Sequence, residues 1–176
     1  MKHDRLVLTR PLPKTGQTQQ YQAGDDGYIE AGWWRGRLNV NNKTRFIAKT
    51  LDGDDVVIDL ATGLMWAADG NSSINHLGNV ITWPSAVDFP FGKEFAGFSD
   101  WRLANINELL SIVDYSQSNP AINEILFPNT SPNPYWSSTT YSFDTDKAWY
   151  EVFLYGHTVY RLKTDSCRLR CVRGGV

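Results

Sequence analysis

Short stretches of strand-like pattern, separated by turn residues, recur along this sequence. Residues 45–48 and 55–60 have high strand propensity and are joined by Leu51-Asp52-Gly53-Asp54. Asp-Gly readily adopts the positive φ angles of a tight hairpin turn, so the first two strands are predicted here. Further strands are predicted at 135–140, 148–154, 159–163 and 168–173.

Two short helices are predicted between these strands. Thr82 is a suitable N-cap for the first, and Pro84 suits its first turn. Asn105 and Glu108 form a capping-box pattern at the start of the second. The apolar faces consist of Trp83, Ala86 and Val87 in the first helix and of Ile106, Leu109, Leu110 and Val113 in the second.

A long loop is expected over residues 116–134, held in place by Ile122, Ile125, Leu126 and Phe127. The predicted fold class is α+β, with two short helices packed on small, mostly antiparallel sheets in a loop-rich chain.

The chain has material for one domain with a sizeable core, which we expect over residues 46–176. Residues 1–45 are predicted to form an N-terminal arm that packs on this domain or on a neighbour. The arm contains Trp33-Trp34, and adjacent residues of an extended chain point to opposite sides. One indole is then free to contact a second chain, so we expect a homo-oligomer.

Charge and hydropathy limit the partners. The 17 basic and 19 acidic residues are well mixed and give a net charge of −2, so neither nucleic acid nor an anionic membrane surface is predicted as a partner. Leu6-Val7-Leu8 is far shorter than the apolar core of a signal peptide. No stretch approaches the length of a membrane span, so neither a signal peptide nor a span is predicted.

Metal-binding patterns are weak. His3, His76 and His157 are isolated from one another, and no zinc or copper motif occurs. Calcium is the one cofactor for which oxygen ligands are present, in Asp25-Asp26 and around Asp52, Asp54, Asp55 and Asp59. Turn chemistry explains these aspartates more simply, so no cofactor is predicted.

Cys167 and Cys171 are the two cysteines of the chain. In an extended strand their Cα atoms would lie about 13 Å apart, beyond the roughly 7 Å that a disulfide allows. Reduced thiols are therefore expected.

Four motif segments stand in a fixed order along the chain, and three of them contain a tryptophan. They are Thr62-Gly63-Leu64-Met65-Trp66, Asp100-Trp101-Arg102-Leu103 with Glu108-Leu109, Tyr135-Trp136-Ser137-Ser138, and Val172-Arg173-Gly174. With the Trp-x-x-Ala of residues 83–86, they resemble the Lcl C-terminal domain family, bacterial domains typified by the C-terminal domain of the Legionella collagen-like adhesin. Ala104 stands where the family pattern has proline.

This resemblance implies a C-type-lectin-like fold, related to that of formylglycine-generating enzymes and of the variable proteins of diversity-generating retroelements. It also implies a cell-surface or secreted location. In the variable proteins the ligand face uses the C-terminal strands and loops, so the resemblance implies the same region here.

Asp100, Trp101 and Arg102 allow two interpretations. The carboxylate and the guanidinium could form a pair at a ligand site. Alternatively, Trp101 is buried and Arg102 binds loop carbonyls as a structural clamp. We favour the clamp, because a buried arginine needs several acceptors and a loop-rich fold supplies them.

The densest group of aromatic and charged residues lies between residues 141 and 161. Along the predicted strand 148–154, Trp149, Glu151 and Phe153 share one face, which would be an unusual set to expose without a partner. The alternative is that Trp149 and Phe153 pack under a loop or the arm. The predicted ligand-binding residues are Tyr141, Phe143, Asp144, Lys147, Trp149, Glu151, Phe153, Tyr155, His157, Tyr160 and Arg161.

The sequence thus favours a non-catalytic recognition module that binds a protein or a glycan, similar to an adhesin domain or a retroelement variable protein. The alternative is a copper and thiol oxidase similar to formylglycine-generating enzymes, using Cys167 and Cys171. In that family the paired thiols follow the Arg-Gly-Gly motif, whereas here they precede Arg173-Gly174-Gly175. No enzymatic activity is therefore predicted.

Overall fold

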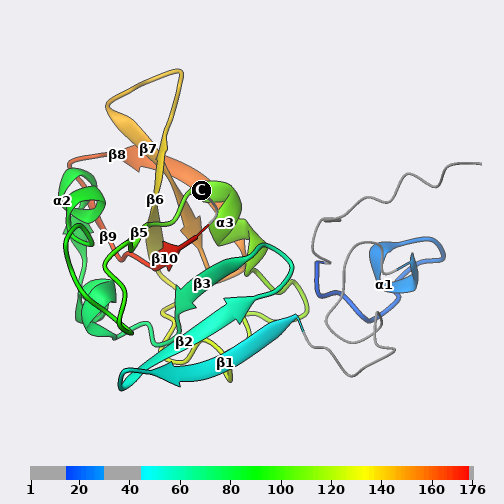
Figure 1. Cartoon of the computed structure of the whole chain (residues 1–176). Coiled ribbons are helices and arrows are strands. Elements are labelled where there is room, and N and C mark those ends of the chain that lie inside the picture. The colour runs from blue at the N-terminus through cyan, green and yellow to red at the C-terminus, as the bar shows by residue number, and fades with distance from the viewer. Residues whose placement is uncertain (1–14, 30–44, 175–176) are drawn as a thin grey trace, which may run out of the picture.

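The computed structural model describes residues 15–29 and 45–174. In these residues the chain forms three small sheets with short helices and long loops between them (Figure 1). The α+β, loop-rich class predicted from the sequence is confirmed. No helix in the described ranges has both the length and the apolar character needed to cross a membrane.

The largest sheet has five strands in the order β1-β2-β3-β10-β5. Its members are β1 (Phe46–Leu51), β2 (Asp54–Asp59), β3 (Leu64–Ala67), β10 (Cys171–Arg173) and β5 (Arg102–Leu103), and every neighbouring pair is antiparallel. The last strand of the chain therefore lies inside the sheet, and β1 forms one edge of it.

The predicted β1–β2 hairpin is confirmed. Its turn residues Asp52 and Gly53 have φ angles of 49° and 87°. Both values lie in the left-handed region that Asp-Gly tolerates and that a two-residue hairpin turn requires.

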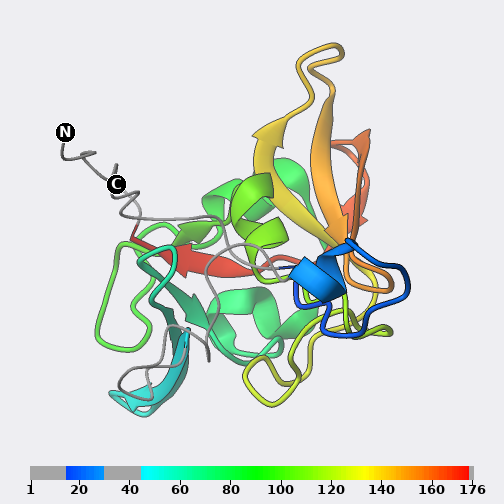
Figure 2. The ribbon, with the colours of Figure 1, turned by 90° about the vertical axis from the view of Figure 1, so that its right-hand side faces the viewer.

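A second sheet of three strands, β6 (Pro134–Thr140), β7 (Lys147–Val152) and β8 (His157–Leu162), projects from the body of the domain (Figures 1 and 2). Two further short strands, β4 (Ile81–Thr82) and β9 (Ser166–Cys167), pair with each other. The predicted strand 168–173 is only partly formed, because the chain enters β10 at Cys171 and the Arg170 side chain turns into the interior.

Both predicted helices are present as α2 (Trp83–Asp88) and α3 (Ile106–Ser111). The capping box of α3 is confirmed, since Asn105 accepts from the Glu108 N–H and Glu108 accepts from the Asn105 N–H. Thr82 occupies the N-cap position of α2 without making the expected side-chain cap, because its hydroxyl donates to Ser85 instead. A 3₁₀ helix, η1 (Ser73–Gly78), and a single turn, α1 (Asp26–Ile29), complete the elements of the described residues.

The core has two parts, separated by the five-stranded sheet. Consecutive residues of a strand point to opposite faces, and Val56 and Val57 accordingly belong to different clusters. Trp66 is buried in one cluster, and Trp101 and Trp136 are buried in the other. The motif tryptophans therefore specify the interior of the domain.

Two buried arginines connect loops to this core through hydrogen bonds and an ion pair. Arg45 makes a two-pronged ion pair with Asp59, at 2.9 and 2.7 Å, and also donates to the carbonyl of Ser111. Arg170 donates to the carbonyls of Ala67 and Ala68 at 3.1 and 3.2 Å and to Thr130 Oγ1 at 2.6 Å.

The described part of the predicted arm, residues 15–29, is organised around Asp25. The Asp25 carboxylate accepts from the backbone N–H groups of Tyr21, Gln22 and Tyr28, and the bond from Tyr21 is the main cause of its lowered pKa. The carbonyl of Thr15 accepts from the N–H of Tyr115 at 2.9 Å, which ties this segment to the domain. Trp33 and Trp34, on which the predicted oligomer depends, lie outside the described residues.

Candidate ligand-binding site

The predicted site residues separate into four groups in the structure. One group surrounds the β6–β7 turn, a second is buried, a third lies at the β7–β8 turn, and Arg161 lies on the other face of the sheet. Only the first group forms an aromatic surface. We call this group the aromatic patch, and it consists of Tyr141, Phe143, Asp144, Lys147, Trp149 and Tyr160.

Three rings pack together at the centre of the aromatic patch. Tyr141 and Tyr160 are stacked, with ring centroids 4.1 Å apart and planes 4° apart. Trp149 is edge-on to both, with centroids 5.2 Å from Tyr141 and 5.6 Å from Tyr160. Trp149 and Tyr160 are direct cross-strand partners, so the β7–β8 register brings these rings together. The rings thus hold one another in place without a ligand.

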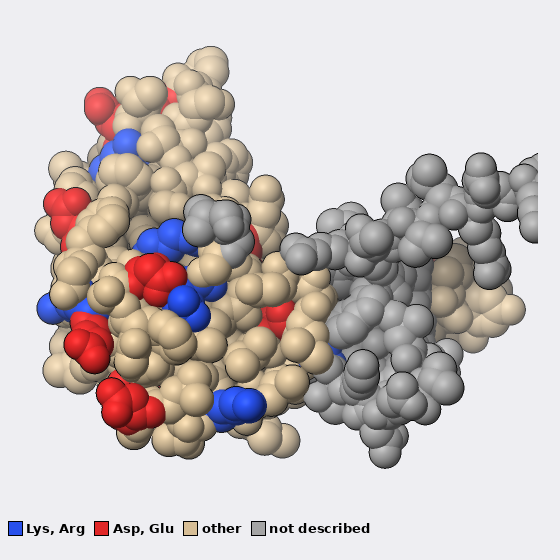
Figure 3. Space-filling model, viewed as in Figure 1, with Lys and Arg blue, Asp and Glu red and all other residues tan. Residues whose placement is uncertain are grey.

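The β6–β7 turn adds an exposed ring and an ion pair. Phe143 exposes 89% of its surface and Tyr160 exposes 41%. Lys147 Nζ lies 3.1 Å from Asp144 Oδ2 and 5.5 Å from the centroid of the Tyr160 ring. The hydrogen bond between Lys147 and Asp144 lowers the pKa of Asp144 and raises the pKa of Lys147, so both groups are charged at neutral pH. Figure 3 shows the projecting end of the hairpin as a mostly uncharged surface with charges to one side.

The expectation that Glu151 and Phe153 are exposed is wrong, because both are fully buried. Phe153 lies beyond the end of β7 and packs edge-on to Tyr135, at 5.3 Å between centroids, in the cluster around Trp66. Helix α3 packs against β6 and β7, so this face of the sheet is covered at its inner end. Phe153 is therefore part of the interior, whereas Trp149 packs on Tyr141 and Tyr160 at the surface.

Tyr155, His157 and Arg161 are also separate from the aromatic patch. Tyr155 and His157 are exposed at the β7–β8 turn, at the other end of the strands from Phe143. Arg161 alternates with Tyr160 along β8 and therefore points to the opposite face. There it donates to Asp165 Oδ2 at 3.0 Å and to Cys167 Sγ at 3.6 Å.

The two cysteines are free and buried, and they belong to different sheets, β9 and β10. Cys171 donates from Sγ to the carbonyl of Ile74 at 3.1 Å. Burial raises the pKa of Cys167 to about 11, although the Arg161 guanidinium opposes this, and burial raises the pKa of Cys171 as well. Both thiols are therefore protonated at neutral pH, which is unfavourable for nucleophilic or metal-binding chemistry.

This protonation predicts slow thiol chemistry. In the native protein we expect both thiols to react with an aromatic disulfide reagent at least on the order of 100-fold more slowly than in the denaturant-unfolded chain, because native thiolate is scarce and access is blocked. Stopped-flow absorbance at neutral pH measures both rates. Fast reaction of either native thiol would contradict this expectation and favour the oxidase alternative.

Five of the six aspartates considered for calcium, all except Asp52, accept hydrogen bonds in turns and strands. Asp54 accepts from the N–H of Ala96, and Asp55 accepts from the hydroxyl of Thr50. Asp59 is paired with Arg45. Across residues 15–29 and 45–174, no three or more His, Cys, Asp or Glu side chains are grouped so as to hold a metal ion.

The Asp100 and Arg102 side chains each bind a different partner. Arg102 makes two hydrogen bonds to Glu108, at 2.8 and 2.6 Å, and a third to the carbonyl of Gly174. Asp100 pairs with Arg173, whose guanidinium lies 3.7 Å from the centroid of the Phe98 ring. The clamp interpretation fits this geometry, with a carboxylate as the main acceptor of Arg102.

Trp66, Trp101 and Trp136 of the motifs are thus buried in the core. The charged motif residues Asp100, Arg102 and Arg173 connect β10 and the residue after it to the neighbouring strand and loops. The family model of the Lcl C-terminal domain matches residues 55–173, more than half of the chain. The chain belongs to the Lcl C-terminal domain family. No curated protein matches the sequence. In this Lcl C-terminal domain the motifs specify the scaffold, and the aromatic patch lies outside them.

Proposed function

We propose that this Lcl C-terminal domain is a non-catalytic recognition module that binds a protein or a glycan through the aromatic patch. The observation that carries the proposal is the surface ring cluster of half-buried Tyr141 and Trp149 with exposed Tyr160, and the exposed Phe143 beside it. Such rings offer a large apolar area at a small entropy loss, which is why they are enriched at interfaces and beneath bound sugars. Because the rings already pack on one another, their side chains lose less conformational entropy when a ligand binds.

The surroundings of the patch support recognition of a ligand with both apolar and polar groups. Asp144 and Lys147 place one charge of each sign beside the rings. A rim of this kind around an apolar centre favours specificity over raw affinity. The C-type-lectin-like fold, an adhesin-like role and a cell-surface or secreted location belong to this proposal through the family resemblance alone.

Loss of two exposed rings should remove binding and leave the fold intact. The double variant Phe143→Ala and Tyr160→Ala is expected to lose at least about tenfold in affinity for any ligand found on a glycan and surface-protein array, because exposed aromatic anchors dominate such contacts. The matched control is Phe91→Ala with Tyr155→Ala, which removes the same ring types from other exposed positions. Equal binding by the two double variants would contradict the proposal.

A further inference from the structure

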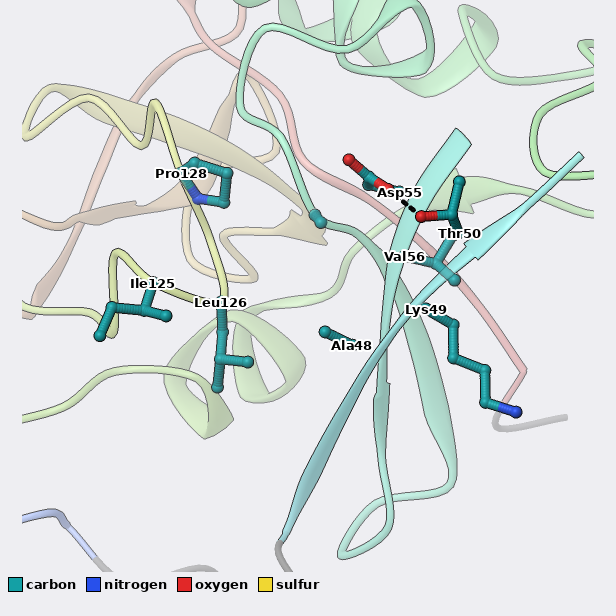
Figure 4. A pocket seen from close by; sticks show the side chains of 9 residues that line it. Ala48, Lys49, Thr50, Asp55, Val56, Ile125, Leu126 and Pro128 are labelled. Atoms are coloured by element: carbon teal, nitrogen blue, oxygen red, sulfur yellow. Dashed lines mark hydrogen bonds between the residues drawn. The ribbon is translucent and has the colours of Figure 1, made fainter. Parts of the chain in front are cut away.

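A second candidate binding site lies far from the aromatic patch, beside the edge strand β1. In Figures 1 and 2 this strand lies at the end of the domain opposite to the β6–β7 turn. A groove of about 330 Å³ runs between β1 and the loop over residues 125–128 (Figure 4). Its lining consists of Ala48, Lys49, Thr50, Asp55, Val56, Ala68, Ile125, Leu126 and Pro128.

The loop side of the groove is apolar, and its backbone is hydrogen-bonded. Figure 4 shows Leu126 directed toward Ala48, with Pro128 further along the same wall. The N–H groups of Ile125 and Leu126 both donate to Asn123 Oδ1, at 3.1 and 3.3 Å, which fixes the loop backbone. Ile125 is nevertheless 93% exposed, although the sequence predicts that it helps to hold this loop in place. A large apolar side chain is thus exposed to solvent next to the apolar side of the groove.

The strand side of the groove carries backbone groups that face away from the sheet. Leu60 donates to the carbonyl of Arg45, and bonded and non-bonded pairs alternate along an antiparallel ladder. It follows that Ile47, Lys49 and Leu51 exchange hydrogen bonds with β2. The N–H and C=O groups of Ala48 and Thr50 point outward instead, and within the described ranges nothing bonds to them.

We propose that β1 and its groove bind an extended segment of a partner protein, which adds to the sheet as a further strand. Ala48 and Thr50 supply two donors and two acceptors at the spacing of alternate strand residues. The partner segment would place apolar side chains at alternate positions over Leu126 and Ile125. Between them, an acidic residue would face the exposed ammonium of Lys49, on the other side of the strand.

Selection from a displayed library of random linear peptides tests this proposal. Enriched peptides should alternate apolar and acidic residues and lose at least about tenfold in affinity for Ala48→Pro and for Ile125→Asp. Proline at position 48 removes only an outward N–H, so the β1–β2 pairing stays intact. The matched control for Ile125→Asp is Phe91→Asp, another exposed apolar residue, which should bind the peptides like the parent.

Hydrogen exchange on the parent protein tests the same contact without a variant. In the free protein the amides of Ala48 and Thr50 should exchange faster than those of Ile47, Lys49 and Leu51. A saturating selected peptide should protect Ala48 and Thr50. The proposal is overturned if no peptide is enriched over a selection on the Ile125→Asp variant, if the selected peptides bind that variant equally well, or if these two amides stay unprotected.

Discussion

Replacing Arg170 with methionine is expected to lower the free energy of unfolding by about 3 kcal/mol or more. The guanidinium is fully buried and holds the carbonyls of Ala67 and Ala68 together with the hydroxyl of Thr130. Methionine fills much of the space but donates nothing, so two buried carbonyls lose their partner. Each such loss costs about 1–3 kcal/mol, and relief from burying the charge offsets only part of the total.

Arg168 provides the matched control. It is half-buried two positions away, and its side chain makes no ion pair within residues 15–29 and 45–174. Arg168→Met should change the free energy of unfolding by less than about 1 kcal/mol. Urea denaturation followed by tryptophan fluorescence measures both variants. Similar losses for the two would show that Arg170 does not hold the loops.

Replacing Glu151 with glutamine is expected to flatten the pH dependence of the unfolding free energy between pH 5 and 8. Glu151 is fully buried, its Oε1 has no hydrogen-bond partner among residues 15–29 and 45–174, and its Oε2 accepts from Thr158 Oγ1 at 2.8 Å. Burial raises the pKa of Glu151 from the ordinary 4.5 to about 7, against the opposing effect of the Thr158 hydroxyl. The neighbouring Tyr115, whose own pKa is raised by burial, stays neutral over this range.

Protonation of Glu151 favours the folded state. The folded state holds the Glu151 proton more tightly than the unfolded state, so stability rises as pH falls from about 7 toward 4.5. The difference amounts to about 3 kcal/mol, present at pH 5 and lost above pH 8. Glutamine stays neutral throughout and should give a flatter profile of unfolding free energy. Glu124→Gln, at an exposed position, should keep the parent profile.

Features that depend on neighbouring residues were predictable from the sequence. The β1–β2 hairpin follows from Asp52-Gly53, and the start of α3 follows from the Asn105 and Glu108 pair. Burial of the motif tryptophans follows from their size and from the hydrogen-bonding residues around them. Each of these features is set within a few residues of chain.

Features that depend on distant packing were not predictable in this way. Strand alternation placed Trp149, Glu151 and Phe153 on one face, but it cannot show that α3 covers only the inner end of that face. A buried arginine with carbonyl acceptors was expected at position 102, whereas Arg170 fills this role. The groove beside β1 gave no signal in sequence, because it joins residues 48–50 to residues 125–128.

The most direct test of the central claim is to map a bound ligand on the parent protein by amide chemical shifts. The ligand is the one bound most tightly on the glycan and surface-protein array, titrated into the isotopically labelled chain. If the ligand binds at the aromatic patch, the largest shifts fall within residues 141–149 and 158–162. Shifts confined to the β7–β8 turn at Tyr155 and His157, or to the groove beside β1, would contradict it.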